Sequence, residues 1–381
     1  MRVAFIGLKG IPAKFGGVEQ HVDSLSKGLA ARHHRVSVYV RPWYSGTGRK
    51  NYEGVRLVAV PTLKTKHLDA AVHTFLSSIH CLFTSAEIIH YHGIGPSLFS
   101  IIPRLMGRKT VSTIHRLDWA AKKWGRAARL FLKMGEWVSL HVPHRTIVVS
   151  EGIKQYVRSV YQKDPVVIAN GVPPPVFRPL RILRQKYDLR EGQYILFLGR
   201  LVPEKRPDLL IQAFRALSPA SEKNGRLKLV LAGGSSATDD YVRWLQKIAQ
   251  GDPRVIFTGY VWGEEKAELF SHALIFVLPS NLEGLPISLL EAQSYGLCCL
   301  ASDIEPHREV IQDGQDGRLF RSEDGEDLRA RLAALLEHPE EIKRLGQRAS
   351  RNVQKRFSWE DVIEKTITVY NEALSGRGPR F

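Results

Sequence analysis

The sequence predicts an α/β protein made of two doubly wound parallel-sheet domains. Its 381 residues suit two domains. Strand-like apolar runs alternate with helical stretches in both halves, which is typical of parallel sheets covered by helices. A proline-rich segment, residues 170–179, interrupts this alternation. Because ligands of such sheets bind at the carboxyl ends of the strands, we expect the two domains to face a cleft.

The first half begins with an apolar run that we interpret as a strand. Residues 18–32 then carry Val22, Leu25 and Leu29 at helical spacing, which predicts a helix. The same reasoning along the chain predicts a first domain over residues 1–172. Its expected strands are 3–7, 36–40, 55–61, 88–92, 109–115 and 145–149, and its expected helices are 18–32, 68–85, 96–106 and 126–141.

Three consecutive prolines, Pro173 to Pro175, stiffen the chain where the alternation stops. We therefore expect residues 173–186 to form a linker and residues 187–357 to form the second domain. Its expected strands are 194–199, 227–232, 255–258, 274–278 and a run around Cys298, and its expected helices are 207–217, 239–250, 264–272, a helix that carries Glu291, 324–337 and 339–357. A last helix is expected over residues 359–375.

Cysteine usage and hydropathy predict a cytoplasmic protein. Cys81, Cys298 and Cys299 have the spacing of neither a zinc site nor a disulfide framework, which fits a reducing compartment. Met1 and Arg2 lead directly into the first strand without the pattern of a signal peptide. No uncharged apolar run reaches the length of about 18 residues that a membrane span needs.

The excess positive charge lies in the first half of the chain. Residues 1–180 contain 26 Lys and Arg against 9 Asp and Glu, whereas residues 181–381 contain 29 of each. The net charge of +17 therefore belongs to the first half. Such asymmetry indicates an anionic partner, which is a membrane surface, a nucleic acid or an acidic substrate.

Residues 279–292, Pro-Ser-Asn-Leu-Glu-Gly-Leu-Pro-Ile-Ser-Leu-Leu-Glu-Ala, carry the strongest functional signal. The spacing of two carboxylates alone is common by chance. However, Pro286 suits the start of a helix, which places Glu283 in the entering loop and Glu291 inside an apolar run, where a carboxylate needs a partner or a ligand. We expect the carboxylates to lie ~8–12 Å apart, beside helix N–H groups that favour phosphate. This layout suits a nucleotide sugar.

Two basic residues follow the expected strand 194–199. Arg200 offers a fork of donors and Lys205 a compact charge, so together they suit the oxygens of a diphosphate. The alternative is a solvated basic turn, which is the interpretation that we prefer for Arg206. Glycine-containing turns after the next two strands allow backbone to approach a ligand or read a base, at Gly233, Gly259, Tyr260 and Val261.

Together these motifs resemble those of the retaining GT-B glycosyltransferases of glycosyltransferase family 4. The resemblance covers nearly the whole chain, and its most specific parts are residues 199–205 and 283–292. It implies two Rossmann-like domains facing a cleft, with residues 358–381 crossing back onto the first domain. It also implies a hexosyltransferase of the EC 2.4 class that retains the anomeric configuration.

The resemblance implies roles for residues of the second domain. Glu283 would contact hydroxyls of the donor sugar and Glu291 the ribose hydroxyls, while Arg200 and Lys205 would hold the diphosphate. Backbone groups would face the sugar and phosphate at Gly284, Leu285 and Pro286. No Asp-x-Asp pair that would hold Mg²⁺ or Mn²⁺ is present. We therefore expect no metal and no cofactor.

In the first domain, Gly16 and Gly17 lie in a glycine-rich loop that resembles the loop with which this family closes over the phosphates. The loop is not the dinucleotide fingerprint. Its sequence, Gly-Ile-Pro-Ala-Lys-Phe-Gly-Gly-Val-Glu, resembles the bacterial polysaccharide-assembly branch, which includes rhamnosyltransferases. His115 stands where many family members have a histidine near the donor sugar, although that branch often has Asp there. The alternative is a structural histidine at the end of a strand, whose hydrogen bonds are made within the protein.

Residues 118–133 mix acidic, basic and aromatic side chains. Asp118 is a candidate for contact with the acceptor or the loop. The basic and aromatic residues suit the surface of an anionic bilayer, and the alternative is an amphipathic helix with a solvated basic face. The charge of the first domain favours the bilayer. The candidates are Trp119, Lys122, Lys123, Trp124, Arg126 and Arg129.

We therefore expect a glycosyltransferase that moves a sugar from a nucleotide-diphosphate sugar to a hydroxyl of a lipid-linked or cell-surface glycan, as in lipopolysaccharide or exopolysaccharide biosynthesis. It would act on the inner face of the cytoplasmic membrane. A sugar-nucleotide epimerase has the same architecture but needs no acceptor. A basic nucleic-acid-binding protein is an alternative of another class, although no nucleic-acid module is evident.

Overall fold

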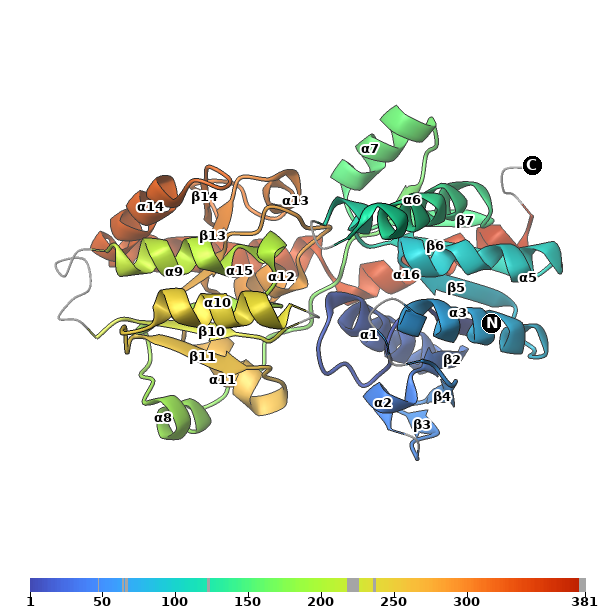
Figure 1. Cartoon of the computed structure of the whole chain (residues 1–381), viewed down its shortest axis with the longest axis horizontal. Coiled ribbons are helices and arrows are strands. Elements are labelled where there is room, and N and C mark those ends of the chain that lie inside the picture. The colour runs from blue at the N-terminus through green and yellow to red at the C-terminus, as the bar shows by residue number, and fades with distance from the viewer. Residues whose placement is uncertain are drawn as a thin grey trace. The chain divides into compact units, whose positions relative to one another are not determined.

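The computed structural model describes residues 1–46, 48–63, 65, 68–121, 124–217, 226–235 and 238–376 (Figure 1). The chain divides into two compact units. The first unit is Met1–Gly171 with Trp359–Phe381, and the second is Val172–Ser358. Each unit contains one sheet of mostly parallel strands covered by helices, which confirms the predicted fold class.

The sheet of the first unit runs in the order β3-β4-β2-β1-β5-β6-β7-β8, and every neighbouring pair is parallel except β3 with β4. The first strand is central, so the chain order reverses between β1 and β5, and such a reversal opens a crevice at the carboxyl ends. The strands are β1 (Arg2–Ile6), β2 (Arg35–Val40), β3 (Asn51–Tyr52), β4 (Val55–Ala59), β5 (Ile88–His92), β6 (Lys109–Ile114), β7 (Arg145–Val148) and β8 (Val166–Val167).

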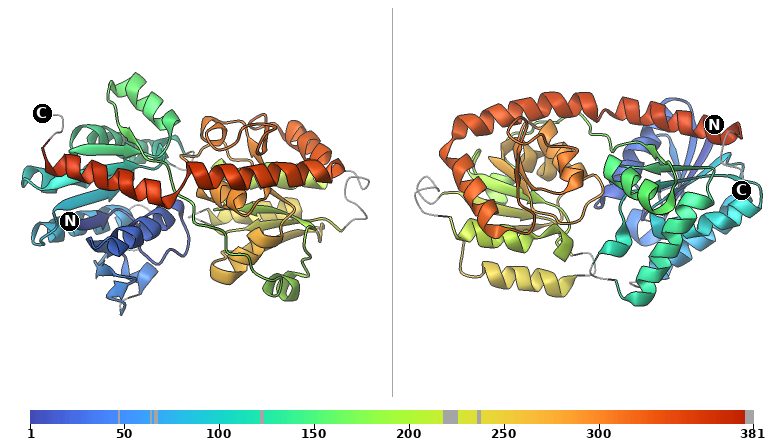
Figure 2. Two further views of the ribbon diagram at one scale, coloured as in Figure 1. Left: turned by 180° about the vertical axis from the view of Figure 1, so that it is seen from behind. Right: turned by 90° about the horizontal axis from the view of Figure 1, so that it is seen from above.

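Alternate residues of β1 face opposite sides of this sheet. Val3 and Phe5 join a core that includes α1 (Gly17–Ala31) and α16 (Trp359–Leu374), whereas Ala4 and Ile6 face α3 (Leu68–Leu82). Figure 2 shows α16 lying along the first unit, where it contacts α1 and β6. The other helices of this unit are α2 (Pro42–Ser45), α4 (Ile94–Ser97), η1 (Leu98–Ser100), α5 (Ile101–Leu105), η2 (Asp118–Ala120), α6 (Arg126–His141) and α7 (Glu151–Tyr161).

The sheet of the second unit repeats this plan in the order β11-β10-β9-β12-β13-β14, with all neighbours parallel. Its first strand is again central, and the order reverses between β9 and β12. The strands are β9 (Tyr194–Leu198), β10 (Lys228–Ala232), β11 (Val255–Gly259), β12 (Ile275–Leu278), β13 (Cys298–Ser302) and β14 (Arg318–Phe320). The helices are α8 (Ile182–Tyr187), η3 (Pro203–Lys205), α9 (Pro207–Arg215), α10 (Asp239–Ala249), α11 (Gly263–His272), α12 (Ile287–Ser294), α13 (Glu305–Arg308), α14 (Gly325–Glu337) and α15 (Pro339–Arg356).

Two of the segments that the sequence prediction covered differ from it in the structure. The expected helix 96–106 is divided into α4, η1 and α5, because Pro96 and Pro103 cannot donate the N–H groups that a continuous helix needs. Residues 173–186, expected as a linker, include α8. The start of α8 is fixed by the buried carboxylate of Glu268, which accepts hydrogen bonds from the N–H groups of residues 181, 182 and 183. Among the helices of the described residues, none has the length and apolar content to cross a membrane.

Candidate functional site

The segment 279–292 of the second unit connects β12 to α12. Glu283 lies in the loop and Glu291 is the fifth residue of α12, in agreement with the sequence prediction. Pro286 is the residue before the helix rather than its first residue, with φ −77° and ψ 108°. The rest of α12 is largely buried, as are Gly284, Leu285 and Pro286 themselves. The segment therefore holds its two carboxylates on a rigid support.

Glu283 forms a buried ion pair with Lys205. The ammonium Nζ of Lys205 lies 2.5 Å from Oε1 of Glu283, and the two side chains are only 11% and 8% exposed. Burial is the largest influence and acts to raise the pKa of Glu283. The charges of Lys205 and His307, with hydrogen bonds from Lys205 and Ser280, together outweigh it, so the pKa is lowered from its ordinary value. Glu283 is therefore a carboxylate near neutral pH.

Glu291 is held by a lysine that the sequence did not identify. Lys266 of α11 places its Nζ 2.6 Å from Oε1 of Glu291. The second carboxylate oxygen, Oε2, is buried and has no hydrogen-bond partner among the described residues. The only signal in the sequence was the expectation that a carboxylate in an apolar helix needs a partner. That expectation does not say which residue provides it.

The ends of β9, β10 and β11 lie together at one edge of the sheet. The N–H of Gly233 donates to the carbonyl of Gly259 over 2.8 Å, and the N–H of Gly199 donates to the carbonyl of Ala232 over 2.9 Å. Gly233 has φ 150°, and a Cβ there would lie 1.8 Å from the carbonyl oxygen of Gly199. Only glycine fits at position 233, where the turn after β10 passes close to the turn after β9.

Arg200 follows β9 at this edge. Its side chain is half-buried, and it makes no ion pair with any residue that the structure describes. Arg206, in contrast, is bound to Asp208 and Glu323, so it is ion-paired within the protein and not solvated as we expected. Tyr260 donates its hydroxyl to the carbonyl of Ser235. The half-buried Val261 follows it in the chain.

His307 is a buried residue beside this site that the sequence did not single out. Its Nδ1 lies 2.7 Å from the carbonyl oxygen of Ser302, so Nδ1 carries the proton. Burial lowers its pKa to about 4, although the charge of Glu283 acts in the opposite direction. His307 is therefore a neutral neighbour of the Glu283–Lys205 pair.

In the first unit, the glycine-rich loop leads from β1 into α1. Gly16 precedes α1 and Gly17 is its first residue. Side chains further along the chain fix the loop. Glu19 accepts the N–H of Lys9, Asp23 accepts the N–H of Ala13, and the hydroxyl of Tyr44 accepts the N–H groups of Lys14 and Phe15.

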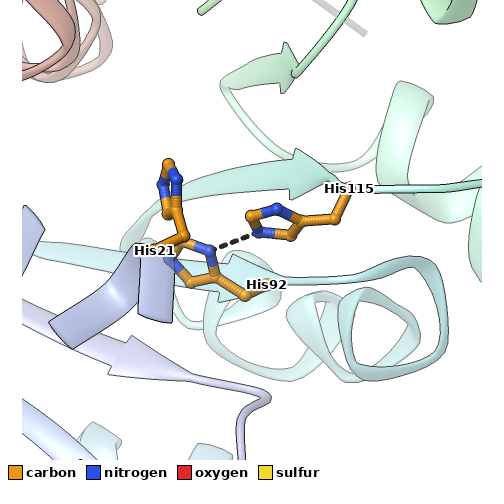
Figure 3. A group of neighbouring side chains, drawn as sticks. All are labelled: His21, His92 and His115. Carbon is orange, nitrogen blue, oxygen red and sulfur yellow. Dashed lines mark hydrogen bonds between the residues drawn. The ribbon is translucent and has the colours of Figure 1, made fainter. Parts of the chain in front are cut away.

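His115 follows β6 and belongs to a cluster with His21 and His92 (Figure 3). Its Nε2 lies 2.9 Å from Nδ1 of His92. Burial lowers the pKa of His21 to about 4 and the pKa values of His92 and His115 well below the ordinary value of 6.5. The three imidazoles are therefore neutral at physiological pH.

The remaining candidates of the first unit lie on η2 and α6. Asp118 pairs with the guanidinium of Arg116 at 2.8 Å. Trp119 is half-buried, and its indole N–H donates to the carboxylate of Glu136. Trp124 is also half-buried, whereas Arg126 and Arg129 are exposed on α6. Lys122 and Lys123 lie outside the described residues.

Comparisons with known proteins define the class. Residues 15–175 match Glycosyltransferase Family 4, and residues 181–352 match Glycosyl transferases group 1. The D-inositol 3-phosphate glycosyltransferase of Streptomyces coelicolor is 31% identical over 94% of this chain and 87% of its own length. HepE of Anabaena, solved with UDP-glucose, superposes with a TM-score of 0.81 at 16% identity, covering 98% of this chain and 100% of that one.

WaaG, a glycosyltransferase involved in lipopolysaccharide biosynthesis, superposes with a TM-score of 0.77 at 20% identity, covering 97% of this chain and 99% of that one. The two parallel-sheet units therefore have the GT-B architecture, and the protein is a glycosyltransferase. The chain belongs to glycosyltransferase family 4.

Proposed function

We propose that this glycosyltransferase moves a sugar, with retention of configuration and without a metal, from a nucleotide-diphosphate sugar to a hydroxyl of a lipid-linked or cell-surface glycan. The second unit would bind the donor. Glu291 would accept hydrogen bonds from the ribose hydroxyls, and Glu283 from hydroxyls of the transferred sugar. Arg200 and Lys205 would hold the diphosphate.

The single observation that carries this proposal is the carboxylate of Glu291. One oxygen is bound to Lys266, and the other is buried without a partner among the described residues. A buried acceptor left unpaired costs about 1–3 kcal/mol, so such an atom indicates a ligand group that fills the position. A ribose hydroxyl is a donor of the required kind, and HepE, of the same fold, was solved with a nucleotide sugar.

A diphosphate site needs positively charged side chains that are not already neutralised by carboxylates of the protein. Arg200 makes no ion pair with the described residues, and its guanidinium presents donors in a fork that fits phosphate. Lys205 is paired with Glu283, but an ammonium group carries three N–H donors. In this proposal, the ion pair would hold Lys205 between the sugar and the phosphates. Gly233, Gly259, Tyr260, Val261, Gly284, Leu285 and Pro286 would supply backbone around the donor.

The transfer step follows from these positions. The acceptor hydroxyl attacks the anomeric carbon on the face that the leaving diphosphate vacates, and a new glycosidic C–O bond forms as the C–O bond to the phosphate breaks. A phosphate oxygen takes the proton of the hydroxyl. Arg200 and Lys205 stabilise the charge that develops on the diphosphate. No protein nucleophile takes part. The roles that the family resemblance implies for His115, Gly16 and Gly17 stay predictions.

The outer face of α6 supports contact with an anionic bilayer, at the cytoplasmic surface of the membrane. Leu130, Met134 and Trp137 are 62%, 50% and 51% exposed along this helix. Basic residues border them, and the first unit has 28 Lys and Arg against 13 Asp and Glu. Apolar side chains beside basic ones suit the interface of a bilayer with negative headgroups. A lipid-linked acceptor would be met there.

A screen of nucleotides and nucleotide sugars by thermal shift tests the donor site. We expect nucleotides that carry one particular base to raise the melting temperature of the wild type. Most of that increase should be lost in Glu291→Gln. Glu341→Gln is the matched control, because Glu341 is a half-buried carboxylate of the same unit that pairs with Arg318 away from α12. The absence of a shift with every nucleotide would contradict the proposal.

Product identification separates transfer from epimerisation. With the stabilising donor and a lipid-linked acceptor, a transferase yields a glycosylated lipid and a free nucleoside diphosphate. An epimerase converts the donor to product without any acceptor. The anomeric configuration of the product, measured by NMR, tests retention, and full activity after treatment with EDTA tests independence from Mg²⁺ and Mn²⁺.

Sedimentation with lipid vesicles tests the membrane surface. We expect binding to vesicles that contain phosphatidylglycerol, weaker binding at high salt, and loss of binding in the variant Leu130→Ser/Trp137→Ser. Trp262→Ser is the control, because Trp262 is a similarly exposed tryptophan of the second unit. Equal retention on neutral vesicles, or preferential retention on duplex DNA, would contradict an anionic membrane as the partner.

A further inference from the structure

Three histidines from distant parts of the first unit meet at the carboxyl edge of its sheet (Figure 3). His21 lies in α1, His92 is the last residue of β5, and His115 follows the end of β6. One ring nitrogen from each lies within 4.8 Å of the others. The sequence predicted no metal site, because the three residues lie far apart along the chain and show no ligand spacing. The order of β1, β5 and β6 in the sheet brings them together.

We propose that His21, His92 and His115 bind a divalent transition-metal ion such as Zn²⁺. Imidazole nitrogen is a preferred ligand of zinc, copper, iron and nickel, whereas Mg²⁺ and Mn²⁺ prefer oxygen. Tetrahedral zinc with Zn–N bonds of about 2.0–2.1 Å places its ligand atoms ~3.3 Å apart. The observed separation of up to 4.8 Å is wider than this, so binding requires the rings to turn. Three protein ligands leave a fourth position for water.

His21 and His92 each have a ring nitrogen that is available to a metal ion. Nδ1 of His21 lies 3.0 Å from Oδ1 of Asn170, which only accepts hydrogen bonds, so this nitrogen carries the proton and Nε2 has the lone pair. A partner of this kind on the far nitrogen is usual for histidines that bind metals. His92 is 1% exposed, and its Nε2 has no hydrogen-bond partner among the described residues.

The neighbouring His90 is a buried histidine with a structural role, and it can be compared with His92. Its Nδ1 lies 2.8 Å from the hydroxyl of Tyr370 and its Nε2 lies 2.7 Å from Oγ1 of Thr113, so both nitrogens are used. Its ring lies 4.2 Å from that of His92, centre to centre. His92 therefore differs from His90 in having a ring nitrogen that no described residue uses.

Calorimetric titration with Zn²⁺ of the full chain, purified without a histidine tag and freed of metal with EDTA, tests this site. We expect one ion per chain, and an affinity at least about 10–100-fold lower in His115→Gln and in Asn170→Ala. His73→Gln is the matched control, since His73 is a fully buried histidine of α3 outside the cluster. Binding with the same affinity in His115→Gln would overturn the proposal.

Substitution with Co²⁺ gives a second measurement that needs no variant. We expect the intense visible absorption of tetrahedral Co²⁺ in the wild type, without a thiolate charge-transfer band, because the cysteines are buried outside the cluster. A weak octahedral spectrum, or Zn²⁺ binding at less than one ion per chain, would overturn the proposal. Nucleotide-induced thermal shifts measured with and without Zn²⁺ keep its failure distinct from that of the donor site.

Discussion

The ammonium of Lys266 lies 2.6 Å from the carboxylate of Glu291. Lys266 lies in α11 and Glu291 in α12, so no single sequence motif contains both residues. The contact holds one oxygen of Glu291, and the other oxygen has no hydrogen-bond partner among the described residues. In the same unit, Lys205 fixes Glu283 in a similar way. Each carboxylate of the segment 279–292 therefore has a lysine that fixes its direction.

Replacing Lys266 by Met should weaken nucleotide binding without removing a group that touches the nucleotide. Glu291 then loses its counter-charge, and its carboxylate is free to turn. We expect the dissociation constant of the stabilising nucleotide, measured by calorimetry, to increase about tenfold, which corresponds to about 1.4 kcal/mol. Lys186→Met, which breaks a more exposed pair with Glu265, is the control. Unchanged affinity in Lys266→Met would refute the positioning role.

Replacing Lys205 alone should destabilise the protein more than replacing both members of its ion pair. Lys205→Met leaves the carboxylate of Glu283 buried without its cation, and broken buried pairs cost about 3–5 kcal/mol. The double variant Lys205→Met/Glu283→Gln has no buried charge at this position. In urea unfolding we expect it to recover most of the loss, although it stays inactive as a transferase. A double variant no more stable than Lys205→Met would show that the pair is not coupled.

Much of the fold could be predicted from the sequence, because apolar periodicity reports which face of an element is buried. The helix 126–141 and the strand 88–92 were predicted with their observed bounds. The helix α7 was not predicted, although Ser150 caps it and Ile153 and Val157 repeat at helical spacing. The cap and the apolar spacing are local signals, so the sequence alone could have predicted α7. The division of 96–106 into three pieces depends on how each proline is accommodated by its neighbours, which periodicity does not contain.

The residues of the candidate site also fall into two groups, those that the sequence reveals and those that only the fold reveals. Glu283, Glu291, Arg200 and Lys205 were found because they stand in one chain segment or directly after a strand. Lys266 and His307 reach the site from other elements, so only the tertiary fold reveals them. The histidine cluster is the clearest case. His115 was selected on its own, whereas the contact with His21 and His92 depends on which strands are neighbours.

The buried His73 should make the protein less stable in mild acid. Burial lowers its pKa from 6.5 to about 4, and the charge of Arg41 acts in the same direction. Between these values the unfolded chain binds a proton that the folded chain does not. The contribution of the neutral ring is therefore complete above pH 6.5 and is lost as the pH falls towards 4. His73→Gln should make the free energy of unfolding less dependent on pH in this window, by up to about 1.4 kcal/mol per pH unit. Parallel curves for the two proteins, measured in urea, would contradict this.

Gly233 should tolerate no side chain, whereas Gly259 should tolerate one at moderate cost. A Cβ on Gly233 would lie 1.8 Å from the carbonyl oxygen of Gly199, so the two turns must separate. Gly259 has φ 72°, but a Cβ there meets no atom of the described residues within 4 Å. We expect Gly259→Ala to cost about 1–2 kcal/mol from backbone strain alone, and Gly233→Ala to cost more and to abolish nucleotide binding. Equal losses in urea unfolding would show that the close approach does not matter.

Glu136 should hold the loop that carries Trp119. This contact distinguishes that loop from the exposed apolar face of α6. The carboxylate is fully buried and accepts hydrogen bonds from the indole of Trp119 and the hydroxyls of Tyr156 and Tyr161. Lys133 lies over the Trp119 ring, 4.4 Å from its centre. Trp119 is thus fixed from two sides, whereas Trp137 is exposed on the outer face of α6.

Glu136→Ala leaves three half-buried donors without their acceptor. We expect a loss of about 1–3 kcal/mol in urea unfolding, a smaller loss in Glu136→Gln, and non-additive losses when Glu136→Ala is combined with Trp119→Phe. Trp137→Phe, on the exposed face, should add independently to either change. Additive behaviour of Glu136→Ala with Trp119→Phe would mean that the indole does not depend on this carboxylate, and Trp119 would then be available to the bilayer after all.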